Sequence, residues 1–139
     1  MKRIALANAA IVLLAILASC SKGKHALIYN TWQVESMKVH ADSALQYPQN
    51  KKNTLSFENG NTCHLDLGGA RDCWGDVKVR HNNSIKFSHI SKCTFSNLEL
   101  PKSASTFYKL IEMTNHYAIS KNRLILSGDN GEIINFIKQ

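Results

Sequence analysis

The chain has 139 residues, and its 17 Lys and Arg residues against 10 Asp and Glu residues give a formal net charge of +7 at pH 7. The basic residues are scattered, whereas nucleic-acid-binding proteins usually concentrate them in a stripe with interleaved aromatic side chains. The composition therefore argues against nucleic-acid binding, and the length fits one domain with a core of its own.

The first predicted element is an export signal. Lys2 and Arg3 precede an apolar run over residues 4–17, which is shorter than the roughly 20 residues that a permanent transmembrane helix needs. A basic head followed by such a run is typical of a secretory signal peptide. The run ends at Leu17-Ala18-Ser19-Cys20, which resembles the lipobox of bacterial lipoproteins, whose cysteine is lipidated and becomes the new amino terminus.

The lipobox resemblance predicts three parts of the chain. We expect a cleaved lipoprotein signal peptide at residues 1–19, the lipidated Cys20 with a polar tether at residues 20–28, and a folded domain at residues 29–139. Two or more acyl chains would make a stable membrane anchor, because a single chain binds a bilayer only reversibly. An ordinary secretory signal that contains a cysteine and an uncleaved membrane anchor are the alternatives.

The residue after the lipidated cysteine bears on localisation. In Gram-negative lipoproteins a residue other than Asp at this place indicates sorting to the outer membrane, and Ser21 stands here. We therefore expect a location in the bacterial cell envelope, with the domain lipid-anchored at the outer membrane and facing the periplasm.

The first strands of the domain follow from the alternation of polar and apolar residues. From Tyr29 to Val39 the alternation predicts one strand, with a switch of the buried face partway along it. Two shorter strand-like runs at residues 53–57 and 63–67 flank a hairpin turn at residues 58–61. Further strands separated by turn residues are expected at residues 76–80, 84–88, 116–120, 123–127 and 132–138.

One segment has the period of a helix instead. Apolar residues recur at helical spacing over residues 103–114, and Ser103 or Ser105 is available as the N-cap. The side chains expected to pack on the sheet are Phe107, Leu110 and Ile111. The domain should therefore be an antiparallel meander with one helix inserted before its last strands.

Several of these segments also match one known family. Thr31-Trp32-Gln33-Val34 reads as an opening strand that carries a Trp, residues 54–60 read as a "tLsF..nG" hairpin, and residues 107–136 read as a helix, two strands and a closing hairpin. In this order they resemble the META domain of heat-shock-inducible bacterial lipoproteins. The resemblance covers residues 31–137, nearly all of the expected domain.

The central turn of the family is only partly preserved at residues 69–77. Its matching positions are Gly69, Cys73 and Gly75. Its departures are Ala70 for a cysteine, Arg71 for an asparagine and Val77 for a tyrosine. The resemblance implies a mainly β (α+β) fold, an antiparallel curled sheet or open barrel packed on one helix. It also implies an envelope or stress-related role and no established catalytic activity.

Three cysteines remain once Cys20 is lipidated, and an exported compartment favours disulfides. Cys63 is in phase with the leucines of its strand, so we expect it to be buried as a small apolar residue. The family's cysteines cluster in the segments that hold Cys73 and Cys93, so the resemblance implies a Cys73–Cys93 disulfide, with Cys63–Cys73 as the main alternative. Closing a loop of about 20 residues contributes roughly 3 kcal/mol in the chain-entropy model.

A metal site is a weaker alternative for the cysteines. His64, His81 and His89 could join them as zinc or copper ligands, because thiolates and imidazoles suit both metals. The sequence, however, contains no Cys-x-x-Cys or His-x-x-x-His pair, and His64 should point away from its neighbour Cys63 on a strand. We therefore predict no metal ligand and no cofactor-binding residue.

A catalytic site is equally weakly supported. Asp66, Asp72 and Asp76 bracket the central turn and could form a paired-carboxylate site. Solvated turn residues beside Arg71 and Lys78 are the favoured interpretation. The sequence has no nucleophile elbow, P-loop or dinucleotide fingerprint, so we predict no catalytic residue.

The sequence thus predicts a lipid-anchored, non-enzymatic envelope protein that binds a protein or another envelope component. The membrane is its expected partner through Cys20, and an envelope protein is the expected second partner. The main alternative is a carrier of a small apolar ligand such as a lipid, because Thr31-Trp32 is similar to the Gly-x-Trp start of lipocalins. That motif lacks its Gly here, and the domain is short for a lipocalin. An enzyme that uses the carboxylates near Cys73 is the third hypothesis.

Overall fold

The computed structural model describes Leu27 and residues 29–48, 52–58, 61–69, 71–94 and 99–139. The predictions for residues 1–26, which include the signal peptide and the lipidation of Cys20, lie outside the described residues. No helix of the described part of the chain is both long and apolar enough to cross a membrane.

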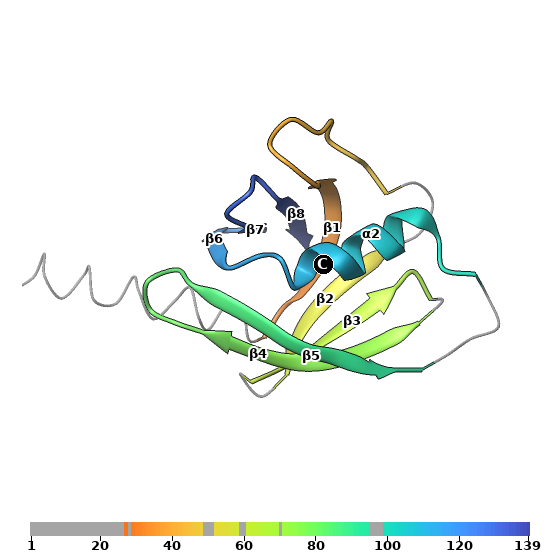
Figure 1. The fold of residues 1–139 in the computed structure, drawn as a ribbon. Coiled ribbons are helices and arrows are strands. Elements are labelled where there is room, and N and C mark those ends of the chain that lie inside the picture. Colours follow the sequence, from red (N-terminus) through yellow and green to blue (C-terminus); the bar gives the residue numbers. More distant parts are fainter. Residues whose placement is uncertain (1–26, 28, 49–51, 59–60, 70, 95–98) are drawn as a thin grey trace, which may run out of the picture.

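An antiparallel sheet of eight strands forms the described domain (Figure 1), in the order β5-β4-β3-β2-β1-β8-β7-β6. Consecutive strands are neighbours in the sheet except for β5 and β6, which are its two edge strands, and β1 pairs with β8. The strands are β1 (Thr31–Lys38), β2 (Asn53–Glu58), β3 (Thr62–Leu67), β4 (Asp72–Val79), β5 (Ile85–Cys93), β6 (His116–Ser120), β7 (Arg123–Ser127) and β8 (Ile133–Lys138).

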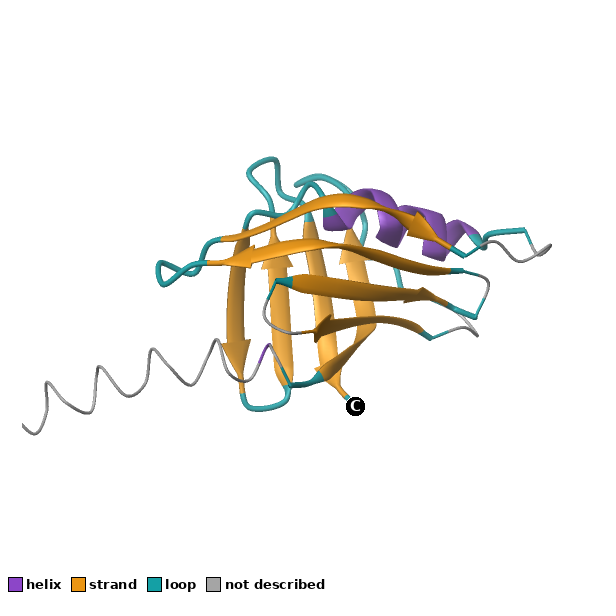
Figure 2. Cartoon of the chain, turned by 90° about the horizontal axis from the view of Figure 1, so that it is seen from below, coloured by secondary structure: helices purple, strands orange, loops and turns teal. Residues whose placement is uncertain are grey.

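The sheet curls into a half-barrel. Figure 2 shows β2 to β5 crossing the remaining strands at a steep angle, with helix α2 (Lys102–Ile111) along the open side. The edge strands meet at one corner, where Ser84 and His116 form an isolated bridge and Tyr117 N–H donates to the Asn83 carbonyl oxygen at 2.9 Å. The expectation of a mainly β curled sheet with one helix is therefore confirmed for the described residues.

The concave face of the sheet is packed with side chains. Phe107 of α2 meets Phe136 of β8 edge-on, with 6.0 Å between the ring centroids. Trp32 of β1 is also fully buried. Other large side chains that are at most 1% exposed include Leu27, Met37, Leu55, Leu65, Leu67, Ile85, Leu110, Ile111, Leu124, Leu126 and Ile134. Side chains of every strand and of the helix thus share one core.

The switch of buried face in the first strand is confirmed. The register of β1 with β8 shifts between Val34 and Ser36, and the consecutive residues Ser36 and Met37 are both buried. A bulge of this kind lets two adjacent residues face the same side of a sheet. Asn135 donates its amide N–H to the Ser36 hydroxyl at 2.9 Å, so the buried hydroxyl has a partner.

The helix lies where it was expected, but its ends differ. Its buried residues are Ala104, Phe107, Leu110 and Ile111, as the spacing predicts. The expected serine cap is wrong, because Pro101 is the N-cap and no side chain caps the helix. The helix ends at Ile111 rather than at residue 114. Just after it, Met113 N–H donates to the Leu110 carbonyl oxygen and closes a tighter turn.

The largest correction concerns the middle of the chain. Residues 69–77 were expected to form an irregular turn, yet β4 begins at Asp72, and β5 runs on to Cys93 rather than ending at residue 88. The turn itself is confined to the segment around Gly68 and Gly69, whose φ angles of 67° and 74° favour glycine. Glycine and cysteine at inward positions weaken the apolar alternation that normally reveals a strand.

Candidate functional site on strands β3 to β5

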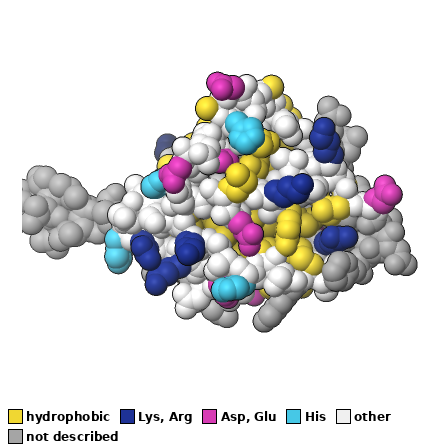
Figure 3. Space-filling model, in the orientation of Figure 1, with side chains coloured by type: hydrophobic (Ala, Val, Ile, Leu, Met, Phe, Trp, Pro, Cys, Tyr) yellow, Lys and Arg dark blue, Asp and Glu magenta, His cyan; other side chains and the backbone are white. Residues whose placement is uncertain are grey.

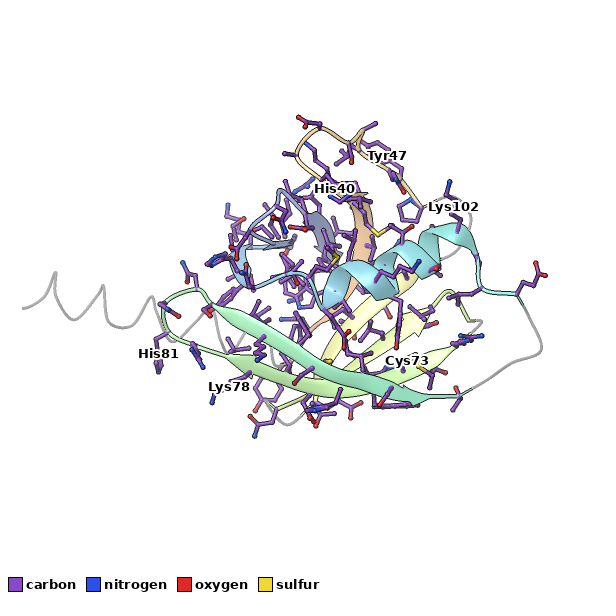
Figure 4. All side chains as sticks on the ribbon, viewed as in Figure 1. His40, Tyr47, Cys73, Lys78, His81 and Lys102 are labelled. Carbon is purple, nitrogen blue, oxygen red and sulfur yellow. A yellow bond between two sulfur atoms is a disulfide. The ribbon has the colours of Figure 1, made fainter. Side chains whose placement is uncertain are left out.

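Cys73 and Cys93 form a disulfide that joins β4 to β5. They are direct partners in the register of the two strands, and Figure 4 labels Cys73 below helix α2. The implied pairing is therefore confirmed, although Cys73 lies on a strand rather than in the expected turn. Cys63 stays free in the core, and burial raises the pKa of its thiol to about 12. A thiol in this state is unreactive at neutral pH.

β5 contains more residues than β4 between two points of their register. Trp74 and Asp76 are two residues apart on β4, while their partners on β5, Lys92 and Ser88, are four residues apart. His89 lies within this bulge with φ 55°, a left-handed conformation that non-glycine residues seldom adopt. Bulges re-aim side chains and are common beside functional sites.

Helix α2 and Gly75 accommodate the bulge from the inside. The Tyr108 hydroxyl donates to the Ile90 carbonyl oxygen, and Ile90 N–H donates to the Glu112 carboxylate at 3.4 Å. The Ile90 side chain then lies against Gly75 of β4, where an added Cβ would be 2.6 Å from Ile90 Cγ1. The bulge is therefore fixed by specific contacts.

The outer face of β3 and β4 carries an aromatic pair. His64 stacks on Trp74, with 4.8 Å between the ring centroids and 28° between the planes. His64 Nε2 is also 2.9 Å from Asp72 Oδ1. Trp74 is half-buried, so part of this large side chain remains available to a binding partner.

A second His–Asp pair lies beside the first. His89 Nδ1 is 3.0 Å from Asp76 Oδ2, and both side chains are largely exposed. This pair borders a hollow of about 180 Å³ lined by Thr62, Trp74, Gly75, Asp76, His89 and Ser91. We call the outer surface formed by His64, Trp74, Asp76, His89 and the hollow between them the β3–β5 face.

The three aspartates considered as catalytic carboxylates each have a partner of their own. Asp72 contacts His64 and Asp76 contacts His89. Asp66, which is opposite Asp72 in the register, accepts a hydrogen bond from Gly69 N–H at 2.7 Å. Asp72 lies on β4 rather than in the expected turn, and Asp76, the first residue of the predicted strand 76–80, lies on the same strand. The aspartates therefore stabilise the β3–β5 face and its turn.

A Ser, a His and an Asp line the same hollow, which invites comparison with a catalytic triad. The Ser91 hydroxyl donates to the His89 carbonyl oxygen at 3.3 Å, so its described hydrogen bond is to the backbone and not to the imidazole. A triad instead needs the nucleophile hydroxyl bonded to the imidazole base. The arrangement can bind polar groups, and it lacks the described contact that would activate Ser91.

The structure separates the residues considered as metal ligands. Cys63 is in the core, Cys73 and Cys93 are bonded to each other, and His81 is at the β4–β5 turn. The described residues include no group of three or more His, Cys, Asp or Glu side chains placed to hold a metal ion.

An apolar pocket of about 220 Å³ opens on the other side of the disulfide, toward α2. Its lining residues are Leu67, Arg71, Cys73, Ser91, Cys93, Leu100 and Tyr108. Across the β2–β3 ladder from Leu67 lies Asn53, which is fully buried. Neither polar atom of the Asn53 side chain has a hydrogen-bond partner in the described part of the chain.

Trp74 is the residue that sequence analysis missed. It was taken for part of a turn, although Asp72, Trp74 and Asp76 alternate with Cys73 and Gly75 in the sequence. Reading glycine and cysteine as small inward residues would have predicted the strand and placed Trp74 on its outer face.

Comparisons with known proteins identify the fold. No protein-family model and no curated protein matches the sequence. The NMR structure of a protein from Burkholderia xenovorans is similar, with a TM-score of 0.65 and 14% identity over 85% of this chain and 87% of that chain. A DUF4847 family protein from Bacteroides vulgatus has a TM-score of 0.60 and 13% identity over 82% and 95% of the two chains. At this identity the likeness shows a shared β half-barrel fold.

Proposed function

We propose that the protein is a non-enzymatic binding module, anchored by lipid at Cys20 to the bacterial outer membrane and facing the periplasm. The lipobox Leu17-Ala18-Ser19-Cys20 and the following Ser21 support the anchor and its location. The resemblance to META-domain lipoproteins adds a stress-related role. The partner is another envelope protein, bound through the β3–β5 face.

The stacked Trp74–His64 pair on the outer face is the observation that carries this proposal. A Trp on the solvent side of a sheet adds little to the core, and Trp is among the residues most enriched at the centres of protein–protein interfaces. The two His–Asp pairs beside it supply polar groups in fixed positions. An aromatic centre with a polar rim is the usual composition of such interfaces.

In vivo photocrosslinking tests the proposal. A photoreactive amino acid replaces Ser91, at the edge of the β3–β5 face, or Tyr47, which is 63% exposed outside the strands. We expect a discrete crosslinked product from position 91. Trp74→Ala should reduce it strongly, because losing a central aromatic anchor costs at least about 2 kcal/mol, roughly 30-fold in affinity.

Tyr47→Ala, which removes an exposed aromatic side chain elsewhere, is the matched control and should leave the product unchanged. Equal export and an intact Cys73–Cys93 disulfide show that each variant folds. A product at position 91 that survives Trp74→Ala, or the same products from both positions, would contradict binding at this face.

The apolar pocket beside the disulfide supports a second candidate, a carrier of a small apolar ligand. Leu67, Leu100 and Tyr108 line this pocket, and Asn53 next to it has an unsatisfied amide. Native mass spectrometry of the delipidated protein tests this function. A carrier should retain extra mass, and Leu67→Trp, which fills the pocket, should remove it. Retention of no added mass by the wild type would exclude the carrier.

A further inference from the structure

Three basic side chains surround a shallow hollow near the β4–β5 turn. Lys78 on β4 and Lys86 on β5 are direct partners in the register, and Arg80 follows at the end of β4. They line a hollow of about 530 Å³ together with Asn61, Asp76, Val77 and Ser88. Figure 3 shows Lys and Arg side chains gathered at this end of the molecule, and Figure 4 labels Lys78 and the neighbouring His81 there. We call this surface the basic hollow.

The basic hollow has an excess of positive charge. Like charges directly opposite on neighbouring strands repel each other, so the Lys78–Lys86 pair is unfavourable without an anion. None of the ion pairs among the described residues includes Lys78, Arg80 or Lys86. Asp76 on the rim is already paired with His89. A bound anion would therefore relieve the repulsion.

The basic hollow also lies at the end of the sheet where the chain enters the domain. Because β1 to β4 are successive antiparallel strands, the first residue of β1 and the last residue of β4 lie at the same end of the sheet. Thr31 at the start of β1 is in one row with Ser56, His64 and Trp74. The β4–β5 hairpin therefore projects beyond that row, on the side of the tether.

The tether limits how far this end can be from a membrane. Leu27 is fully buried in the core, and the seven residue-to-residue steps from Cys20 to Leu27 span at most about 25 Å when extended. The opposite end of the sheet carries charges of both signs, with Asp42 in the loop after β1, Asp129 in the β7–β8 turn, Lys38 at the end of β1 and Lys52 just before β2. The loop after β1 and the β7–β8 turn touch, since Ala41 N–H donates to the Asn130 carbonyl oxygen. The basic hollow is thus at the end of the domain that lies nearest to the tether.

We infer that the basic hollow binds the phosphate headgroups of anionic phospholipids in the membrane that holds the anchor. This inference rests on the proposed lipidation of Cys20. Basic residues are attracted to an anionic bilayer within about one Debye length, roughly 8 Å at physiological ionic strength. Headgroup binding would hold the domain in one orientation, with the basic hollow on the membrane and Asp76 at the boundary between this hollow and the β3–β5 face.

Fluorescence quenching by lipid tests the orientation. The full chain, processed in a bacterial host, is reconstituted into vesicles of phosphatidylcholine with or without phosphatidylglycerol. An environment-sensitive dye is attached at Asn82→Cys in the β4–β5 turn or at Asp42→Cys at the opposite end. Cys63 does not take the dye, because its buried thiol has a pKa of about 12. Brominated lipids then quench only a dye that touches the bilayer.

We expect the dye at position 82 to be quenched on vesicles that contain phosphatidylglycerol. The quenching should disappear on vesicles of phosphatidylcholine alone, in high salt, and in the Lys78→Glu/Lys86→Glu variant. An unchanged denaturation midpoint shows that this variant is folded. The dye at position 42 should stay unquenched. Equal quenching at both positions, or quenching at position 82 that does not depend on phosphatidylglycerol, would overturn the inference.

Flotation of the same vesicles separates the two claims. Protein that floats with the vesicles but shows no quenching at position 82 is anchored without headgroup binding, so the inference fails and the proposed anchor stands. Wild-type protein that does not float is not anchored by lipid, and the proposed function fails with it.

Discussion

The two ends of the meander are built differently. The C-terminal strands β6, β7 and β8 pair in a continuous register, without a shift among the described residues. Strands β4 and β5 have a shifted register, a left-handed residue at His89 and a disulfide. Strands β6 to β8 supply buried side chains to the core, whereas β4 and β5 also present Trp74, His89 and the basic hollow on their outer face.

This difference indicates which residues do more than specify a regular antiparallel sheet. A regular ladder needs only alternating side chains and suitable turns. The bulge in β5 depends on three further residues, which are Gly75 beneath it, Tyr108 on α2 and Glu112 at the C-cap of α2, the last two of which bond to its backbone. Irregularities of this kind persist only when surrounding contacts hold them in place.

Of the changes to β4 and β5, removing the disulfide should lower the free energy of unfolding most. The Cys73–Cys93 bond closes a loop of 20 residues, so reduction should lower the free energy of unfolding by about 3 kcal/mol. Urea denaturation of the processed protein with and without reductant measures this change. In the Cys73→Ala/Cys93→Ala variant the reductant should have no effect, and an unchanged wild type would show that the bond does not constrain the chain.

Gly75→Ala should be the next most damaging change. The added methyl would be 2.6 Å from Ile90 Cγ1 and 3.1 Å from Ile90 Cα, so the bulge must move, and overpacking of this kind costs about 2 kcal/mol. Ser120→Ala, at an exposed position of β6, is the control, and its free energy of unfolding should stay within about 0.5 kcal/mol of the wild-type value. Equal stability of the two variants in urea would contradict the close contact.

Tyr108→Phe should have a smaller effect, confined to the bulge. It removes the hydroxyl that donates to the Ile90 carbonyl oxygen, which should cost about 1 kcal/mol. Hydrogen exchange should speed up around residues 88–91 and remain unchanged in β7. The exposed Tyr47→Phe provides the comparison, and faster exchange spread evenly over both regions would refute a local role for Tyr108.

In the regular region, the turn between β7 and β8 should respond to pH. Hydrogen bonds from the Glu132 backbone amide and from Asn130 lower the pKa of the buried Glu132 carboxyl below its ordinary value of 4.5. The folded state then binds fewer protons than the unfolded state, so Glu132 contributes stability above pH 4.5 that is lost as the pH falls through its lower folded pKa.

A Glu132→Gln variant isolates this contribution. The difference in unfolding free energy between wild type and variant should narrow as the pH falls below 4.5. Asp129→Asn, at an exposed position of the same turn, serves as the control. A difference between wild type and Glu132→Gln that stays constant from neutral to acidic pH would show that the carboxyl is not stabilised as an anion.

The same comparison explains what could be predicted from the sequence. Strands β6 and β7 match their predicted bounds, and β8 differs by one residue, because turn residues at 121–122 and 128–131 separate clear alternations. β4 was only half predicted, since Cys73 and Gly75 at inward positions do not read as apolar. Local periodicity reveals regular strands, whereas a bulge depends on residues distant in sequence.

Some features of the candidate site could be predicted from the sequence, and others could not. The Cys73–Cys93 pairing was implied by family resemblance, and the burial of Cys63 followed from strand phase. The stacking of His64 on Trp74 could not be predicted, because it depends on the register of β3 with β4. The basic hollow also depends on register, which brings Lys78 opposite Lys86 although they are eight residues apart in sequence.

Intact mass spectrometry of the protein from the envelope fraction of its bacterial host tests the account most directly. The account predicts a chain that begins at Cys20 and carries the added mass of more than one acyl chain. A chain that keeps residues 1–19, or one that starts elsewhere with an unmodified Cys20 thiol, would contradict it.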